Sequence, residues 1–259
     1  MTGPVEVTRH DGWAVVRIAR EDKRNAVDRA TRDALTAAFA ELRGAARAIV
    51  LTGAGGSFCA GMDLKEREAD RRQGFDTAGD EWIAVNLAIR EHPAVFIAAV
   101  NGLALGGGAT LINVCDLAIA STRASIGCPE MGFATYPGMA GPAIQLSGVT
   151  RKQAAWLVLT TNRIDGATAE RWGMVNECVE PGRLLPRAEE VAAGVARFDA
   201  VALAESKKAL DRIPAHVSDW PGAMEHGQLV NHAIRAKSPA QAEGNARFAA
   251  GGKNPGQGT

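Results

Sequence analysis

Two glycine-rich segments of this chain have the residue types to bind an anion through main-chain N–H groups. The first reads S-F-C-A-G-M-D-L-K over residues 57–65, and the second reads V-N-G-L-A-L-G-G-G-A-T over residues 100–110. Each follows a short apolar run that is typical of a buried strand. Three consecutive glycines ahead of a helix leave N–H groups unpaired and unobstructed, and a helix start favours negative charge, so the pattern indicates an anion site.

Two other interpretations of these segments fit the residues alone. Glycine is common at helix starts, so both segments are equally compatible with ordinary turns. A dinucleotide-binding loop fits less well, because Gly106, Gly107 and Gly108 do not give the G-x-G-x-x-G spacing and Leu111 stands where its last glycine belongs.

A single glutamate, Glu130, is the clearest candidate for acid/base chemistry. It lies in C-P-E, between the strand-like S-I-G and the loop G-F-A-T-Y-P-G. By residue type alone, a solvated surface carboxylate is the default interpretation. Only the surrounding motif favours a carboxyl that exchanges protons with a substrate.

Metal and thiol chemistry have little support. The four cysteines are scattered without Cys-x-x-Cys spacing, which argues against a zinc site and against a disulfide framework. The five histidines lack H-E-x-x-H or equivalent spacing, so no metal is expected. Cys59 and Cys128 are near the candidate loops, but no histidine motif accompanies them, and we expect them to be small buried apolar side chains.

The elements that must position these residues alternate between strands and helices. Apolar runs predict strands at residues 5–7, 13–18, 48–52, 95–100 and 116–120. Helical spacing of apolar residues is found at residues 28–43, 82–89 and 105–114. Strands separated by helices predict an α/β fold with a mainly parallel sheet covered on both faces. Asp116 is expected to cap or brace the start of its strand.

The last third of the chain differs from the first two. From Thr150 onward the residues favour helices, expected at 166–173, 184–198, 201–213 and 240–250, with Pro214, Pro221 and Pro239 as interruptions. The charged segment 65–80 is expected to be a frayed helix that contributes little to a core.

Composition excludes several classes of partner. Of the 259 residues, 46% are apolar, which is ordinary for a globular core. Lysine plus arginine and aspartate plus glutamate both number 29, so neither nucleic acid nor an anionic membrane surface is a default partner. The sequence shows neither a signal-peptide core nor an uninterrupted apolar stretch of roughly 18 residues, and we expect a cytoplasmic, reducing location.

The chain resembles the enoyl-CoA hydratase/isomerase superfamily, also called the crotonase superfamily. The resemblance rests on the loops at residues 58–64 and 100–108, on R-E-D-K-R-N-A at residues 20–26 and on C-P-E-M-G at residues 128–132. Their order and spacing match over nearly the whole chain. The resemblance implies a crotonase-like spiral of ββα units that forms an acyl-CoA-binding core over residues 1–195. A helical trimerisation region would follow over residues 196–259.

The resemblance also assigns roles to the two loops. In the superfamily, the residue after the A-G pair and the middle glycine of the second loop donate N–H bonds to the thioester oxygen of an acyl-CoA. Those positions are Met62 and Gly107 here. Removing a proton alpha to a thioester, or adding a nucleophile to its conjugated double bond, moves charge onto that oxygen, and fixed donors stabilise the resulting enolate.

One departure from the superfamily concerns the acid/base groups. Hydratases of this type carry a glutamate at the position of Glu130 and usually a second one two residues after the third glycine, where this chain has Thr110. A threonine hydroxyl can hold a water but is no base near neutral pH. One carboxyl suffices to move a proton between two carbons, so Thr110 favours a double-bond isomerase, while hydration by Glu130 alone and C–C bond hydrolysis remain open.

Further residues are implied in substrate binding. Arg24 and Lys65 are candidates to face the phosphates of coenzyme A, although each is equally compatible with an exposed solubilising charge. The superfamily's backbone cradle for adenine and pantetheine would involve Ala26, Ala60, Asp63 and Leu64. Tyr136 and Gly138 follow Glu130 in a loop that faces substrate in the superfamily, and packing is the alternative for Tyr136. Phe248 matches a C-terminal aromatic contact, with Lys253 as a displaced basic partner.

These expectations describe an enzyme that acts on an acyl-CoA. Coenzyme A enters as part of the substrate, and no separate cofactor is expected. A homotrimer or a dimer of trimers is implied as the assembly. The alternative from another class is a catalytically silent acyl-CoA-binding protein, against which the presence of Glu130 and both donor loops argues.

Overall fold

A twisted six-stranded sheet forms the centre of the molecule in the computed structural model, which describes residues 3–74 and 77–250. Its strand order is β1-β2-β3-β5-β7-β10, and all neighbours are parallel except the β1–β2 hairpin. The strands are β1 (Val5–Arg9), β2 (Trp13–Ile18), β3 (Ala48–Gly53), β5 (Val95–Val100), β7 (Leu117–Ser121) and β10 (Glu177–Val179). The predicted α/β class with a mainly parallel sheet is confirmed.

A second sheet consists of very short strands. It has the order β4-β6-β8-β9, with β4 (Ser57–Cys59), β6 (Leu103–Leu105), β8 (Ser125–Gly127) and β9 (Ile164–Asp165). The first three are parallel, and only β9 is antiparallel. Of these strands, only the S-I-G run of β8 is evident from the sequence.

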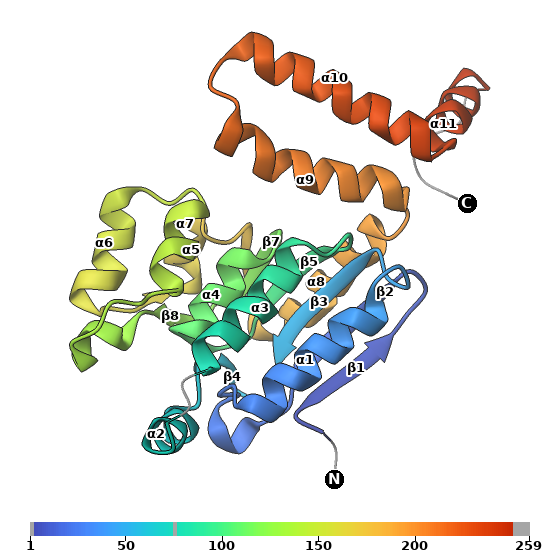
Figure 1. Cartoon of the computed structure of the whole chain (residues 1–259). Helices are drawn as coiled ribbons and strands as arrows, with labels where there is room; N and C mark the ends of the chain where they lie inside the picture. Colours follow the sequence, from blue (N-terminus) through green and yellow to red (C-terminus); the bar gives the residue numbers. More distant parts are fainter. Residues whose placement is uncertain (1–2, 75–76, 251–259) are drawn as a thin grey trace.

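Both faces of the six-stranded sheet are covered. On one face, alternate residues such as Val50 and Ile97 pack against Leu184 and Ala188 of helix α8 (Pro181–Val195). The opposite face packs against helices α1 (Arg29–Leu42), α3 (Ala78–Arg90) and α4 (Gly107–Val114), which lie together in Figure 1. Helix α1 begins with a side-chain cap, because Asp28 Oδ1 accepts a hydrogen bond of 2.9 Å from the Thr31 N–H.

Shorter helices surround this core. They are α2 (Leu64–Arg72), α5 (Ala140–Leu146), α6 (Arg151–Thr160) and α7 (Gly166–Arg171), with 3₁₀ turns η1 (Glu21–Lys23) and η2 (Pro129–Phe133). Helix α2 lies within the charged segment that was expected to add little core, and it has no buried residue. Ion pairs fasten it instead: Arg32 Nη1 of α1 lies 3.1 Å from Glu66 Oε2, and Arg29 Nη2 lies 3.0 Å from Asp70 Oδ2.

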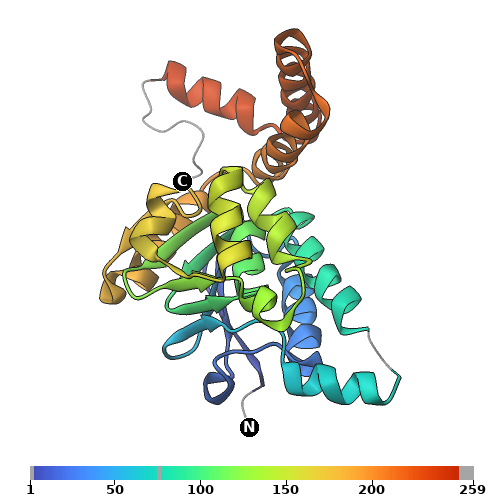
Figure 2. The same ribbon diagram turned by 90° about the vertical axis from the view of Figure 1, so that its left-hand side faces the viewer.

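The last three helices form an arm that extends away from the sheets. They are α9 (Ala200–His216), α10 (Trp220–Lys237) and α11 (Ala240–Ala249). In Figures 1 and 2, α9 and α10 lie side by side beyond the edge of the core, with α11 turning back from their end. Helix α10 has no buried residue in the single chain. Within the described residues, no helix is long and apolar enough to cross a membrane.

Several boundaries differ from the expected ones. The helix expected at 105–114 begins only at Gly107, because Leu103–Leu105 pair as β6. Pro214 does not interrupt α9: it lies in the last turn, and the helix runs on to His216. Pro221 likewise belongs to the first turn of α10, where a missing N–H costs nothing.

A buried ion pair attaches the arm to the core. Lys207 of α9 is 5% exposed, and its Nζ lies 2.8 Å from Asp116 Oδ2. The same ammonium donates to the carbonyl oxygens of Ile89 and Ala94 at 2.9 and 3.0 Å. Asp116 Oδ2 also accepts from the Phe96 N–H at 2.8 Å. Asp116 therefore braces the strands, as expected from its position, and also receives the arm.

Replacing Lys207 with methionine is expected to lower the free energy of unfolding by about 3 kcal/mol, because a buried carboxylate loses its nearest cation. Urea denaturation measures this change. The matched control is Lys208→Met, whose side chain is 67% exposed and pairs with Glu205 at the surface. It should cost less than about 1 kcal/mol, and equal effects of the two substitutions would contradict the anchoring role of Lys207.

Candidate active site

Three neighbouring strands of the small sheet lead directly to the three residues predicted to carry the chemistry. Met62 follows β4, Gly107 follows β6, and Glu130 follows β8. These strands are parallel and adjacent in the order β4-β6-β8, so their carboxyl ends meet at one edge. Ligands of α/β proteins characteristically bind beyond this edge. The fold thereby gathers residues that are far apart in the sequence.

The loop that carries Met62 is held by two asparagine side chains. Asn25 Nδ2 donates to the carbonyl oxygens of Ala54 and Ser57 at 2.9 and 2.7 Å. From the other side, Asn101 Nδ2 donates to the Gly53 and Gly55 carbonyl oxygens at 2.9 and 2.8 Å. Both amides supply the hydrogen-bond donors that a neighbouring strand would supply in a sheet, and they hold the loop in one conformation.

The two loops approach so closely that only glycine fits at their contact. Gly61 has φ +89°, and a Cβ added there would lie 2.8 Å from the Leu105 carbonyl oxygen and 3.2 Å from the Gly107 nitrogen. A Cβ on Gly108 would lie 2.0 Å from the Cys59 carbonyl oxygen. Across the part of the chain that the structure describes, the N–H groups of Met62 and Gly107 have no hydrogen-bond acceptor. Two free main-chain donors are thus brought to one place.

Glu130 lies against the second loop and is half-buried, with one carboxyl oxygen removed from water. A Cβ on Gly106 would stand 2.5 Å from Glu130 Oε1, so the carboxylate occupies space that only a glycine leaves open. Glu130 Oε2 is buried and has no hydrogen-bond partner among the described residues. Burial raises the pKa of this carboxyl above its ordinary value, partly offset by a backbone hydrogen bond.

Gly106→Ala is expected to destabilise the protein by about 2 kcal/mol, because Gly106 has φ +52° and because the new methyl group displaces Glu130. Chemical denaturation measures the loss. Gly132→Ala is the matched control in η2, where an added Cβ meets no described atom within 4 Å. If Gly106→Ala destabilises the protein no more than Gly132→Ala does, the close packing of Glu130 is refuted.

The raised pKa of Glu130 also predicts how stability depends on pH. Folding disfavours the charged form of Glu130. The loss of folding stability is therefore absent at low pH, where the carboxyl is protonated, and develops as pH rises through the folded pKa. Glu130→Gln should therefore melt at a higher temperature than the unsubstituted protein near pH 7, with the difference vanishing below about pH 4. Calorimetric melting temperatures across this range test it.

Glu81→Gln gives the opposite sign and serves as control. A hydrogen bond from Thr77 and the neighbouring Arg32 hold the pKa of Glu81 below its ordinary value. This glutamine variant should be the less stable protein near pH 7, with its deficit fading as pH falls through the carboxyl range. The Glu130 interpretation fails if both substitutions shift stability in the same direction.

Thr110 and the nearby cysteines offer no second acid or base. The Thr110 side chain is 2% exposed, and its hydroxyl donates to the Gly106 carbonyl oxygen at 3.3 Å within its own helix. Burial raises the pKa of the Cys59 and Cys128 thiols to about 12. Both cysteines are buried, as expected, and remain protonated near neutral pH.

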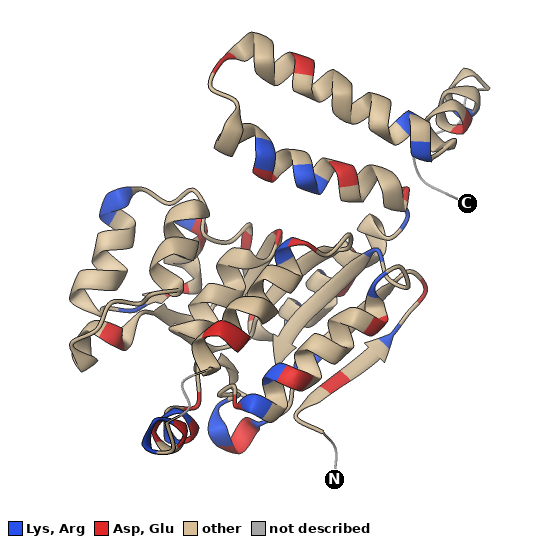
Figure 3. Cartoon of the chain, in the orientation of Figure 1, with Lys and Arg blue, Asp and Glu red and all other residues tan. Residues whose placement is uncertain are grey.

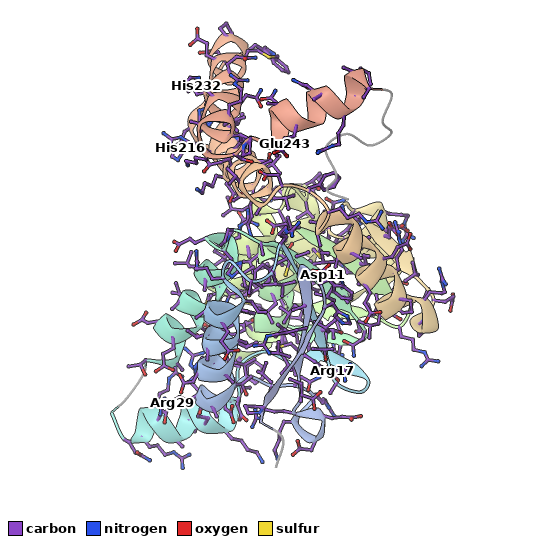
Figure 4. All side chains as sticks on the ribbon, turned by 90° about the vertical axis from the view of Figure 1, so that its right-hand side faces the viewer. Asp11, Arg17, Arg29, His216, His232 and Glu243 are labelled. Carbon is purple, nitrogen blue, oxygen red and sulfur yellow. The ribbon has the colours of Figure 1, made fainter. Side chains whose placement is uncertain are left out.

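Two of the five histidines are remote from this site. In Figure 4, His216 and His232 lie on the arm, away from the sheets. Among the described residues, no group of three or more histidine, cysteine or acidic side chains is arranged to hold a metal ion.

The residues expected to bind coenzyme A lie around α2 and the segment before α1. Arg24 and Lys65 are exposed, and Leu64 is 57% exposed. The Asp63 side chain is already engaged: it caps α2 by accepting from the Lys65 N–H at 3.1 Å and lies 3.3 Å from Arg20. Figure 3 shows charges of both signs on α2 beside those at the start of α1.

Two carbonyl groups of this cradle are likewise committed within the chain. Arg20 Nη1 donates to the Ala26 carbonyl oxygen. The Arg24 carbonyl oxygen accepts from the Ala60 N–H at 3.0 Å. These hydrogen bonds tie together the backbone segments in which the cradle is predicted.

The remaining predicted contacts lie further out. Tyr136 is 51% exposed, and its hydroxyl accepts from Gln145 Nε2 at 3.3 Å. Gly138 is exposed in the same loop. Phe248 lies on α11 and is 70% exposed, while Lys253 lies outside the described residues.

A cavity of about 950 Å³ under α9 is lined by Arg90, Lys207 and other residues, none of them from the loops above, and it belongs to the junction of arm and core.

Comparison with known proteins agrees with this geometry. The sequence model of the family described as "Enoyl-CoA hydratase/isomerase" matches residues 8–253. The chain belongs to the enoyl-CoA hydratase/isomerase family. A relative in Rhizobium meliloti, named "Probable enoyl-CoA hydratase", is 41% identical over 192 residues, covering 73% of this chain and 72% of the relative.

Another relative and a solved structure extend the match. The "Short-chain-enoyl-CoA hydratase" of Clostridium acetobutylicum is 37% identical over 205 residues, which is 77% of each chain. A crystal structure of enoyl-CoA hydratase from Mycobacterium smegmatis superposes with a TM-score of 0.89 at 28% identity, covering 97% of this chain and 98% of the other. The crotonase-type fold expected from the sequence is therefore confirmed.

Three positions in this enoyl-CoA hydratase/isomerase family member escaped the sequence analysis. The roles of Asn25 and Asn101 depend on loops that the sequence does not bring together. A signal existed for Asn25, since asparagine tolerates the left-handed backbone, and here it has φ +57°. Trp82 begins the helical spacing at residues 82–89, which gives no sign that its indole nitrogen lies beside Gly107.

Proposed function

We propose that this chain hydrates an enoyl-CoA thioester, with Met62 and Gly107 N–H groups binding the thioester oxygen and Glu130 as the single acid/base. The observation that carries the proposal is the convergence, at the ends of β4, β6 and β8, of two unpaired main-chain donors and a half-buried carboxyl whose Oε2 has no hydrogen-bond partner. Relatives named enoyl-CoA hydratases add weight to hydration.

The donors lower the barrier by stabilising charge that develops during the reaction. When a nucleophile adds to C3 of the enoyl group, the C2=C3 electron pair moves toward the thioester, and its oxygen becomes an enolate oxygen. Each preorganised N–H contributes about 3 kcal/mol to that transition state. The donor at Met62 belongs to the main chain, so the methionine side chain takes no part in the reaction.

Glu130 supplies the proton transfers. Its carboxylate accepts a proton from water while the water oxygen forms a bond to C3. The protonated carboxyl then delivers that proton to C2, which turns the enolate into a saturated 3-hydroxyacyl thioester and restores the carboxylate. A carboxyl with a raised pKa suits both steps, because it is a stronger base than an exposed glutamate and still returns the proton.

Isomerisation is the second candidate, and Thr110 favours it. Its hydroxyl is engaged with Gly106 and provides no second carboxylate. An isomerase needs Glu130 only to take a proton from C2 of a 3-enoyl thioester, or from C4 of a 2-enoyl thioester in reverse, and to return it at the other carbon. The same enolate and the same two donors serve this reaction.

Two absorbance assays separate these reactions. Incubation with crotonyl-CoA should show loss of the conjugated enone absorbance if the chain is a hydratase. Incubation with a 3-enoyl-CoA should show that absorbance appear if it is an isomerase. Binding of coenzyme A thioesters without either signal, at any protein concentration, would contradict both candidates and favour a silent acyl-CoA-binding protein or C–C bond hydrolysis.

Glu130→Gln should reduce turnover by at least about a hundredfold while leaving the dissociation constant for a saturated acyl-CoA within a factor of about two. Steady-state rates and isothermal titration measure the two quantities. Cys128→Ala is the neighbouring control and should keep most activity, because its buried thiol stays protonated. Full turnover by the glutamine variant would remove Glu130 from the mechanism.

Assembly into a trimer or a dimer of trimers is part of the proposal. The arm exposes large apolar side chains in the single chain: Leu210, Trp220, Met224, Leu229 and Phe248. Such a set exceeds what a monomer ordinarily leaves in water and suits contacts between copies. Coenzyme A would be bound as part of the substrate, near Arg24 and Lys65, whose exposed positive charges suit its phosphates.

A further inference from the structure

Trp82 places an unpaired donor between the two candidate oxyanion loops. It lies in α3 and is 2% exposed, and its Nε1 is buried without a hydrogen-bond partner among the described residues. A Cβ added to Gly107 would lie 3.0 Å from Trp82 Nε1, and the same point is 3.3 Å from Gly61 Cα. The indole nitrogen therefore borders both loops at their closest approach.

An unpaired indole N–H at this place is costly for a residue that only fills space. Buried tryptophan nitrogens normally find an acceptor. On the adjacent turn, Asn86 Nδ2 donates to the Trp82 carbonyl oxygen at 2.7 Å, and Asn86 Oδ1 is buried but makes no hydrogen bond to the indole. Phenylalanine would pack beside Val85 and Ile89 without this energetic cost. The unpaired N–H therefore indicates that a ligand binds it.

Among the buried acceptors without a donor, Glu130 Oε2 is the one that belongs to the candidate acid/base. Trp82 Nε1 faces Gly107, and Glu130 Oε1 faces the preceding residue, Gly106. Glu130 Oε2 is a buried acceptor without a donor, just as Trp82 Nε1 is a buried donor without an acceptor. A hydroxyl group has both functions, since its oxygen accepts and its hydrogen donates. Thr110 cannot be that group, because its hydroxyl donates to the Gly106 carbonyl oxygen.

We propose that the Trp82 indole N–H binds the oxygen at C3 of the acyl group: the hydroxyl of a 3-hydroxyacyl thioester, or the water that becomes it. This inference rests on the proposed function. The bound oxygen accepts from Trp82, gives its proton to Glu130 and uses its remaining electron pair to form the bond to C3. In reverse, the C3–O bond breaks and Trp82 stabilises the charge on the departing oxygen while Glu130 returns the proton.

The consequence is a hydratase that positions water with one carboxylate and one neutral donor. Trp82 would then hold the water that a second glutamate holds in the two-glutamate arrangement. The substrate class is an acyl thioester that carries, or gains, an oxygen at C3. Isomerisation and simple proton exchange at C2 involve no such oxygen and make no demand on Trp82.

Trp82→Phe tests the proposal through two reactions of one protein. Hydration of crotonyl-CoA requires the C3 oxygen, whereas deuterium exchange at C2 of butyryl-CoA in D₂O requires only Glu130 and the thioester donors. The ratio of hydration to exchange rates should fall about tenfold or more, the loss expected for one buried hydrogen bond. Trp156→Phe in α6 is the control, because that side chain is 49% exposed, and it should leave the ratio unchanged.

Ligand binding gives a readout that needs no turnover. Trp82→Phe should weaken binding of 3-hydroxybutyryl-CoA several-fold relative to butyryl-CoA. In the unsubstituted protein, the Trp82 indole proton should shift downfield with the 3-hydroxy ligand and much less with the saturated one. The signal is assignable even if the variant does not fold, since Phe substitutions at the other four of the five tryptophans identify it by elimination.

The outcomes distinguish the two proposals. Equal losses of hydration and exchange in Trp82→Phe, with no differential shift of the indole proton, would overturn the role of Trp82 and leave the hydratase intact. Exchange without any hydration by the unsubstituted protein would remove the hydratase proposal, and a differential indole shift would then still establish the C3 contact.

Discussion

The close approach of two loops at Gly61 and Gly107 is the constraint on which the rest of the site depends. Their separation leaves no room for a side chain at Gly61 or Gly108, and it brings the two unpaired N–H groups together. The small sheet exists to hold this approach, because β4, β6 and β8 pair in parallel and end at the same edge. The large sheet then serves as the base from which these short strands extend.

The site concentrates unsatisfied hydrogen-bonding capacity in an otherwise well-paired region. The loop carbonyl groups are bound by Asn25 and Asn101, and the Asp63 carboxylate by Arg20 and the start of α2. Against this background, the free N–H groups and the Glu130 carboxyl stand out. A protein tolerates such groups in its interior when a ligand completes them, which is why unpaired polar atoms are informative here.

Much of the fold was predictable because it rests on local patterns. Apart from β1 and β10, the strands of the large sheet are mainly apolar runs of five or six residues, and Asp28 marks the start of α1. The small sheet was mostly not predictable, since three-residue strands carry no periodicity. Helix α10 escaped because Pro221 was interpreted as an interruption, whereas proline in a first turn begins a helix.

The candidate site, like the fold, was predictable only in part. Met62, Gly107 and Glu130 were found through motifs, and their strands do converge. The positions of Trp82 and Lys207 depend on tertiary contacts: one indole faces a glycine from another element, and one lysine reaches an aspartate far along the chain. Neither residue type signals such a contact by itself, because tryptophan in a helix and lysine on a helix are usually core and surface.

The main-chain origin of the two donors has a consequence for how such a protein can change over time. A donor that belongs to the backbone survives exchange of the side chain at Met62, but it is vulnerable at the neighbouring glycines, where one methyl group disturbs the loop contact. Polarisation of the substrate is thus insulated from most point substitutions. Point substitutions can nevertheless change which reaction is catalysed, because the reaction depends on a few side chains around a constant backbone. Selection can therefore explore new chemistry at Thr110 or Trp82 without first rebuilding the machinery for activating a thioester.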